Sequence, residues 1–194
     1  MQVPPGSPHW EAYTDGGCPN NRTVSASNPA GWGFCFRMQN DIPLDWIRAY
    51  GPVLTNPDNP QYGGAAVGSN NTAELQAIIE LFDYIYRHPL VPPLPIKLHV
   101  DSQYAVDILQ GISRPTTHIS LVTMLLKWQW LLTSYDVEPI KVPSHTGIEG
   151  NDLADDGATN GYSGEFTSLG RHSLQPPEPM PPPQIHLDTT SLPN

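Results

Sequence analysis

The order of strand-like and helix-like segments is the strongest constraint on the fold of this chain. Three segments with strand character precede the first helical pattern, and strands and helices alternate afterwards. The predicted strands span 9–15, 31–38, 45–53, 96–101 and 137–142, and the predicted helices span 72–88, 103–110, 119–133 and 151–159. Neighbouring strands followed by strand–helix alternation predict an α/β fold, in which one mixed sheet carries helices on its faces.

The first predicted helix has one charged residue on its apolar side. Ile78 and Leu81 recur at helical spacing, and Glu74 falls on the same stripe. Its carboxylate is therefore expected to face the core, where a charge needs a partner. A capping box between Asn71 and Glu74 is the alternative explanation of this carboxylate.

Composition changes at both ends of the chain. The 194 residues suffice for one domain with a real core. We predict that this domain occupies 9–162, after a polar leader over 1–8. Residues 163–194 are rich in proline and have few large apolar side chains, so we expect a disordered or polyproline-like tail. Removal of 173–194 is accordingly expected to leave stability almost unchanged.

The charge balance is acidic, with nine Lys and Arg against nineteen Asp and Glu and a net charge of −10. Such a chain is expected to bind phosphates weakly on its own. Two cysteines, Cys18 and Cys35, make no disulfide framework, which favours a reduced, intracellular setting in the cytoplasm or nucleus. The most apolar stretch, 119–132, is too short to span a bilayer and contains Lys127, so no membrane association is expected.

Four carboxylates stand in separate contexts at predicted strand ends and helix starts. They are Asp15, Glu74, Asp101 and Asp155. Each has an ordinary structural explanation: a turn aspartate, a capping residue, or an acidic first turn of a helix. Their joint occurrence is better explained by one site, because carboxylates gathered from several elements are the ligands that hard divalent cations prefer.

These segments resemble type 1 ribonuclease H, the nuclease that cuts the RNA strand of an RNA–DNA hybrid. The most specific segments are Asp-Ser-Gln-Tyr at 101–104, and His-Thr-Gly at 145–147 followed by Gly-Asn-Asp-Leu-Ala-Asp at 150–155. The resemblance covers about residues 9–162. It implies a ribonuclease H-like five-stranded mixed sheet, with the first three strands antiparallel and helices on both faces.

The resemblance also implies the reaction, which is endonucleolytic cleavage with two Mg²⁺ ions, or Mn²⁺ as a substitute, leaving 5′-phosphate and 3′-hydroxyl ends. The implied metal ligands and catalytic carboxylates are Asp15, Glu74, Asp101 and Asp155. The family pattern selects Asp155 and not Asp152 or Asp156. His145 is expected to assist proton transfer or product release, so that its loss slows turnover without abolishing it.

Seven residues match family positions that contact the hybrid. They are Cys18, Asn21, Ser69, Asn70, Asn71, Ser102 and Gln103. Small polar groups of this kind can read the RNA 2′-hydroxyl across a shallow minor groove. The inserted stretch 19–30 leaves open whether Asn21 or Asn28 makes its contact.

Some family features are missing, and they concern affinity more than catalysis. No basic protrusion lies between the helices near 111 and 118, and His118 stands where relatives have an asparagine that seats a DNA phosphate. One alternative is therefore a domain of a retroelement or viral polyprotein, in which a polymerase or reverse transcriptase, or another tethering protein, supplies substrate binding. A non-catalytic hybrid-binding module and, more distantly, an integrase-like or resolvase-like nuclease are further alternatives.

Overall fold

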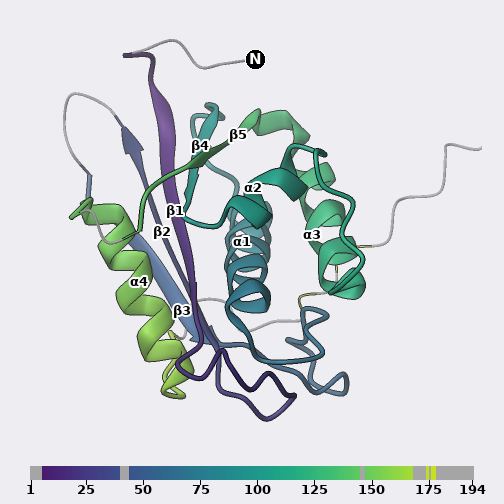
Figure 1. Ribbon diagram of the computed structural model, residues 1–194. Helices are drawn as coiled ribbons and strands as arrows, with labels where there is room; N and C mark the ends of the chain where they lie inside the picture. Colours follow the sequence, from purple (N-terminus) through teal and green to yellow (C-terminus); the bar gives the residue numbers. More distant parts are fainter. Residues whose placement is uncertain (1–5, 40–43, 145–146, 168–173, 175, 178–194) are drawn as a thin grey trace, which may run out of the picture.

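The computed structural model describes residues 6–39, 44–144, 147–167, 174 and 176–177. Its elements are, in chain order, β1 (His9–Gly17), β2 (Gly31–Gln39), β3 (Ile47–Pro52), α1 (Asn70–Arg87), β4 (Ile96–Val100), α2 (Gln103–Leu109), α3 (Ile119–Leu131), the 3-10 turn η1 (Thr133–Tyr135), β5 (Val137–Lys141) and α4 (Glu149–Tyr162) (Figure 1). The predicted order of strands and helices is therefore confirmed.

The five strands form one mixed sheet in the order β3-β2-β1-β4-β5. The β1–β2 and β2–β3 pairs are antiparallel, whereas β4 runs parallel to both β1 and β5. This confirms the expected five-stranded mixed sheet whose first three strands are antiparallel. The central strand β1 is thus antiparallel to its neighbour β2 on one side and parallel to its neighbour β4 on the other.

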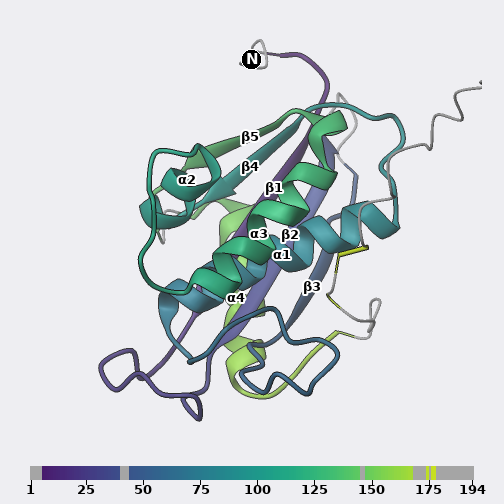
Figure 2. The same ribbon diagram turned by 90° about the vertical axis from the view of Figure 1, so that its right-hand side faces the viewer.

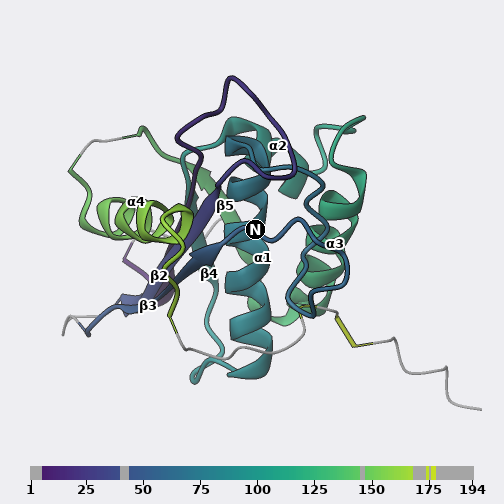
Figure 3. The ribbon, with the colours of Figure 1, turned by 90° about the horizontal axis from the view of Figure 1, so that it is seen from below.

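Helices cover both faces of the sheet, as expected. Helix α4 packs against β1, β2 and β3 on one face, and α1 packs against β1 and β2 on the other (Figure 3). Helix α3 lies outside α1 and contacts it, while α2 lies beside β5 (Figure 2). In the part of the chain that the structure describes, no helix combines the length and apolar character needed to cross a membrane.

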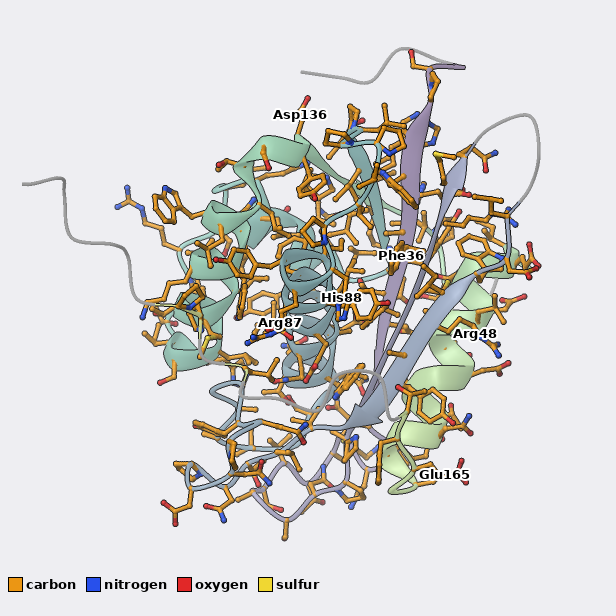
Figure 4. The ribbon with its side chains drawn as sticks, turned by 180° about the vertical axis from the view of Figure 1, so that it is seen from behind. Phe36, Arg48, Arg87, His88, Asp136 and Glu165 are labelled. Atoms are coloured by element: carbon orange, nitrogen blue, oxygen red, sulfur yellow. The ribbon has the colours of Figure 1, made fainter. Side chains whose placement is uncertain are left out.

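The main core fills the space between the sheet and α1. Figure 4 places Phe36 of β2 there, with its ring centroid 5.6 Å from that of Tyr84 on α1. The apolar stripe predicted for α1 is confirmed, because Ile78 and Leu81 are fully buried. Arg48, in contrast, is exposed on β3, next to α4 (Figure 4).

The N-terminus of α1 is capped differently from the predicted capping box. Ser69 is the N-cap: its Oγ accepts a hydrogen bond from the Thr72 backbone nitrogen at 3.1 Å, and the Ser69 nitrogen donates to Thr72 Oγ1 at 2.9 Å. The alternative of a box between Asn71 and Glu74 is therefore wrong. Since Ser69 and Thr72 satisfy both cap donors, the Glu74 carboxylate is not needed at the helix end.

Part of the segment expected to be an unpacked tail contacts the domain. The Thr167 nitrogen donates to the Tyr50 oxygen at 3.0 Å on β3. Leu174 is only 2 % exposed, its nitrogen donates to the Pro60 oxygen at 3.2 Å, and its oxygen accepts from Trp128 Nε1 at 3.2 Å. We expected the tail to offer almost nothing to pack, and Leu174 is an exception. This one large apolar residue lies in the core beside Trp128, whose indole nitrogen donates to it. The boundary at 163 stays a prediction.

Replacing Leu174 by Ala is expected to lower the free energy of unfolding by about 1–3 kcal/mol. This is at or below the low end of the range of about 2–5 kcal/mol for buried leucines, since this segment can detach. A chain that stops after Pro177 keeps Leu174 and is the matched control, so it should melt like the full chain. Urea denaturation of the three proteins checks this. Equal stability of Leu174→Ala and the full chain would show that the contact contributes nothing.

Candidate active site

The site begins where β1 and α1 approach each other closely. Asp15 lies near the end of β1, and Gly16 follows it against the first turns of α1. A side chain on Gly16 would collide with the backbone of Ala73 and Glu74, so only glycine permits this approach. The Gly16 nitrogen also donates to Asp15 Oδ1 at 2.8 Å. The Asp-Gly pair therefore brings a strand carboxylate next to a helix carboxylate.

The third carboxylate arrives from the parallel neighbour of β1. Thr14 pairs with Val100 in the β1–β4 ladder, so the residues that follow them, Asp15 and Asp101, emerge side by side at the same end of the sheet. One oxygen from each of Asp15, Asp101 and Glu74 lies within 4.8 Å of the other two. Three elements that are distant in sequence thus place three carboxylates around one point.

These carboxylates are held in an environment that disfavours their charge. Asp15 and Glu74 are each 7 % exposed. Burial, followed by the charges of Asp101 and Asp155, raises the pKa of Asp15 to about 8. Burial and the charges of Asp15 and Asp101 likewise raise the pKa of Glu74 well above its ordinary value. Within the described residues, no Lys or Arg forms an ion pair with the three carboxylates.

Two oxygens of this cluster are buried without a donor in the described part of the chain, namely Glu74 Oε2 and Asp101 Oδ1. The other oxygen of Asp101 accepts a hydrogen bond from Ser144 Oγ at 2.8 Å. Buried acceptors, negative charge and an all-oxygen donor set are what a hard divalent cation requires. The residues present therefore fit such an ion.

Asp155 lies on α4, next to Asp15 but outside the group of three. Its carboxyl is within hydrogen-bonding reach of Asp15 and is half-buried, whereas Asp152 and Asp156 are exposed. The geometry thus agrees with the choice of Asp155 among the three aspartates, and its role as a ligand stays a prediction. His145 lies outside the described residues. Its neighbour Ser144 is not singled out in the sequence analysis, although Ser144 belongs to the same Ser-His-Thr-Gly motif.

The inserted stretch after β1 folds back on the start of α1. The Asn28 Nδ2 amide donates to Cys18 Sγ, Asn20 O and Gly68 O at 3.1, 2.9 and 3.0 Å. Asn21 is exposed, and its Oδ1 accepts from the Asn70 nitrogen at 2.8 Å. The hydrogen bonds of Asn28 therefore stabilise the loop. Asn21, in contrast, is exposed beside the start of α1.

The remaining predicted contact residues divide into surface groups and helix caps. Asn70 and Asn71 are exposed on the first turn of α1. Gln103 is exposed at the start of α2 and donates to Asp107 Oδ1 at 2.7 Å. The hydroxyls of Ser69 and Ser102 are engaged as N-caps of α1 and α2. Cys18 is buried at 9 % exposure. The exposed amides thus form a polar rim, defined here as Asn21, Asn70, Asn71 and Gln103.

Comparison with known proteins agrees with this geometry. The RNase H family model matches residues 8–163. A protein from Mycolicibacterium smegmatis named Ribonuclease H is 29 % identical over 186 residues, covering 84 % of this chain and 95 % of its own length. The structure of RNase H1 from the halophilic archaeon Halobacterium salinarum superposes with a TM-score of 0.58 at 21 % identity, covering 80 % of this chain and 98 % of that one. The structure of LC11-RNase H1 in complex with an RNA/DNA hybrid superposes with a TM-score of 0.52 at 18 % identity, covering 78 % of this chain and 97 % of that one.

In the absence of metal, stability is expected to fall as pH rises from about 4 to about 8. Folded Asp15 keeps its proton up to about pH 8, whereas unfolded Asp15 releases it near its ordinary pKa of 3.8. The folded state therefore binds more protons in this window, and the free energy of unfolding decreases with pH. Between pH 5 and pH 8, the free energy of unfolding of Asp15→Asn should rise by about 1 kcal/mol or more relative to that of the parent.

Urea denaturation in EDTA at the two pH values measures this difference. Burial also raises the pKa of Glu80 to about 8, so the free energy of unfolding of Asp15→Asn still decreases with pH. The informative quantity is therefore the difference between the variant and the parent in this pH dependence. Asp152→Asn, which removes an exposed carboxylate from α4, is the matched control. If Asp15→Asn left the pH dependence of the free energy of unfolding unchanged, the raised pKa of Asp15 would be contradicted.

Proposed function

The chain belongs to the ribonuclease H family, and we propose that it is an endonuclease that cleaves the RNA strand of RNA–DNA hybrids. The observation that carries this proposal is the convergence of Asp15, Glu74 and Asp101 within 4.8 Å. The fold of the family alone would not support this activity, since proteins of one fold can have different functions. A cluster of buried, mutually repelling carboxylates is costly to keep unless it binds cations, and it supports a catalytic site over a non-catalytic hybrid-binding module.

Asp15, Glu74 and Asp101 would hold divalent cations, with Asp155 as a further ligand on the side of Asp15. Two Mg²⁺ ions, or Mn²⁺ in their place, would supply an activated water and stabilise the leaving oxygen of the phosphodiester. The expected products carry 5′-phosphate and 3′-hydroxyl ends. Ser144 holds one oxygen of Asp101 and so orients the other toward the cluster. His145 is proposed to assist proton transfer or product release nearby.

The polar rim supports an RNA–DNA hybrid as substrate. Asn21, Asn70 and Asn71 lie together at the start of α1, and Gln103 lies on α2, directly after Asp101 and Ser102. Amide groups on α1, which carries Glu74, and on α2, which follows Asp101, can hydrogen-bond 2′-hydroxyls and base edges of a minor groove. The names of the relatives and the hybrid complex of LC11-RNase H1 support the same choice.

The charge distribution supports weak binding by the chain alone. Arg37 and Arg87 are engaged with carboxylates, and between α2 and α3 residues 110–118 contain Arg114 as their single Lys or Arg. With nine Lys and Arg against nineteen Asp and Glu, the chain offers few cations to phosphates, and phosphate contacts supply most of the affinity of nucleic-acid enzymes. The alternative of a domain that depends on a polymerase or another tethering protein therefore stays open within this proposal.

Replacing Asp101 by Asn is expected to leave the fold intact and to reduce hybrid cleavage at least about a thousandfold, because the cluster loses a ligand charge. Asp155→Asn should also be strongly impaired. Asp152→Asn, one turn earlier on α4 and exposed, is the matched control and should retain activity. Cleavage of a labelled hybrid with Mg²⁺, and with EDTA, measures these effects. Full activity of Asp101→Asn or activity in EDTA would refute the mechanism.

Asn21 and Asn28 should respond differently to substitution by Ala. Asn21→Ala is expected to lower kcat/KM on hybrids several-fold with a small change in melting temperature, since its amide is exposed on the rim. Asn28→Ala loses three hydrogen bonds, two of them half-buried, and should cost about 1–3 kcal/mol of stability. Steady-state kinetics and thermal melts separate the two. The reverse pattern would assign the substrate contact to Asn28.

A further inference from the structure

Helix α4 contacts β1 and β2 at three successive levels, and the first lies at the start of the helix. Tyr13 and Cys35 pair across the two strands there. A side chain on Gly150 would collide with the Tyr13 ring, and Cys35 Sγ donates to the Gly150 oxygen at 3.2 Å. The helix has no side-chain N-cap, since Ile148 occupies that position. Contacts with the strands therefore hold its first turn.

The second level lies at the candidate active site. Asp15 pairs with Gly33 of β2. A Cβ on Gly33 would collide with the Ala154 oxygen and would lie 2.7 Å from the Ala158 nitrogen. From the other side, a Cβ on Gly157 would lie 3.2 Å from Gly33 Cα. Backbone contacts backbone here, so neither side can yield by rotating a side chain.

The third level lies near the end of α4 and has the same construction. Gly17 pairs with Gly31, and a Cβ on Gly161 would collide with the Gly51 oxygen and lie 3.1 Å from Gly31 Cα. Gly161 is six residues beyond Asp155, which is on the order of 9 Å along a helix. The second and third levels thus offer two similar glycine contacts, one beside the carboxylates and one remote from them.

We propose that the backbone contact between Gly33 and α4 sets the separation of the Asp15 and Asp155 carboxylates, and through it the affinity of the site for divalent cations. Gly33 is a positioning residue that acts through Asp155. This inference rests on the proposed function, because it presumes that the carboxylates bind metal.

The two carboxylates are attached on opposite sides of this backbone contact. Asp15 is the ladder partner of Gly33, and Asp155 lies in the turn 154–158 that covers Gly33. A residue larger than glycine at position 33 must lift this turn away from the sheet, and Asp155 moves with it. Mg²⁺ demands near-ideal octahedral geometry, so a shift of a ligand by about 1 Å weakens its binding.

The test compares Gly33→Ala with Gly161→Ala. Both variants force the same kind of backbone collision, and both should lower the melting temperature. Gly33→Ala is expected to raise the Kd for Mn²⁺, measured by calorimetry without substrate, about tenfold. Gly161→Ala should change it by less than about threefold, because its collision is with Gly51 of β3, remote from Asp155. Equal Kd values for the two variants, at similar losses of melting temperature, would overturn the proposal.

A milder variant covers the case in which Gly33→Ala does not fold. Gly157→Ala acts on the other partner of the same contact, where the closest approaches are 3.1 Å to Tyr50 Cβ and 3.2 Å to Gly33 Cα. It should raise the Kd for Mn²⁺ several-fold, although alanine normally favours a helix over glycine. Thr159→Ala, at an exposed position of α4, should bind Mn²⁺ like the parent.

The outcomes separate this inference from the proposed function. If the parent chain binds no Mn²⁺, the proposed function fails and this inference fails with it. If the parent binds Mn²⁺ and both Gly33→Ala and Gly157→Ala bind it equally well, the positioning role alone is overturned. Restored cleavage by Gly33→Ala at high Mn²⁺, with a shifted half-saturating concentration, would support the role, since a merely unstable variant would not respond to metal in this way.

Discussion

The repulsion among buried carboxylates is the constraint on which the structure of this site depends. Asp15, Glu74 and Asp101 present oxygens within 4.8 Å of one another, and Asp15 and Glu74 are nearly excluded from water. Two unit charges at that distance repel by about 3 kcal/mol at an effective dielectric constant near 20. A domain whose total stability is about 5–15 kcal/mol cannot keep three such charges without protons or cations. The raised pKa values of Asp15 and Glu74 express this conflict in the metal-free state.

The scaffold resists this repulsion through close backbone contacts. Gly16 lets β1 approach α1, and Gly33 lets β2 approach α4, so the elements that carry the carboxylates cannot drift apart or rearrange independently. The parallel β1–β4 pair places Asp101 beside Asp15. Ser69 caps α1 and thereby spares the Glu74 carboxylate for the cluster. The acidic site is thus held by contacts that involve no charge, so the carboxylates stay gathered, with the pKa values of Asp15 and Glu74 raised, until a cation binds.

The fold and the carboxylates could be predicted from sequence because their signals are local. The apolar stripe around Ile78, the alternation of 96–101 and the motif that ends in Asp155 each lie within one segment. Features that depend on contacts between distant segments could not be predicted. Leu174 packs against Trp128, and Asn28 bonds to Gly68, over separations of 46 and 40 residues. Composition and spacing carry no information on such pairs.

The most direct test of the central claim is anomalous diffraction from crystals of the chain soaked with Mn²⁺. We expect one strong peak bounded by Asp15, Glu74 and Asp101, and a second on the side of Asp155, each with carboxylate oxygens at bonding distance. The first peak should disappear from crystals of Asp101→Asn. Mn²⁺ bound only at other carboxylates of the surface, with the central cluster empty at saturating metal, would contradict the claim that these residues form a metal site.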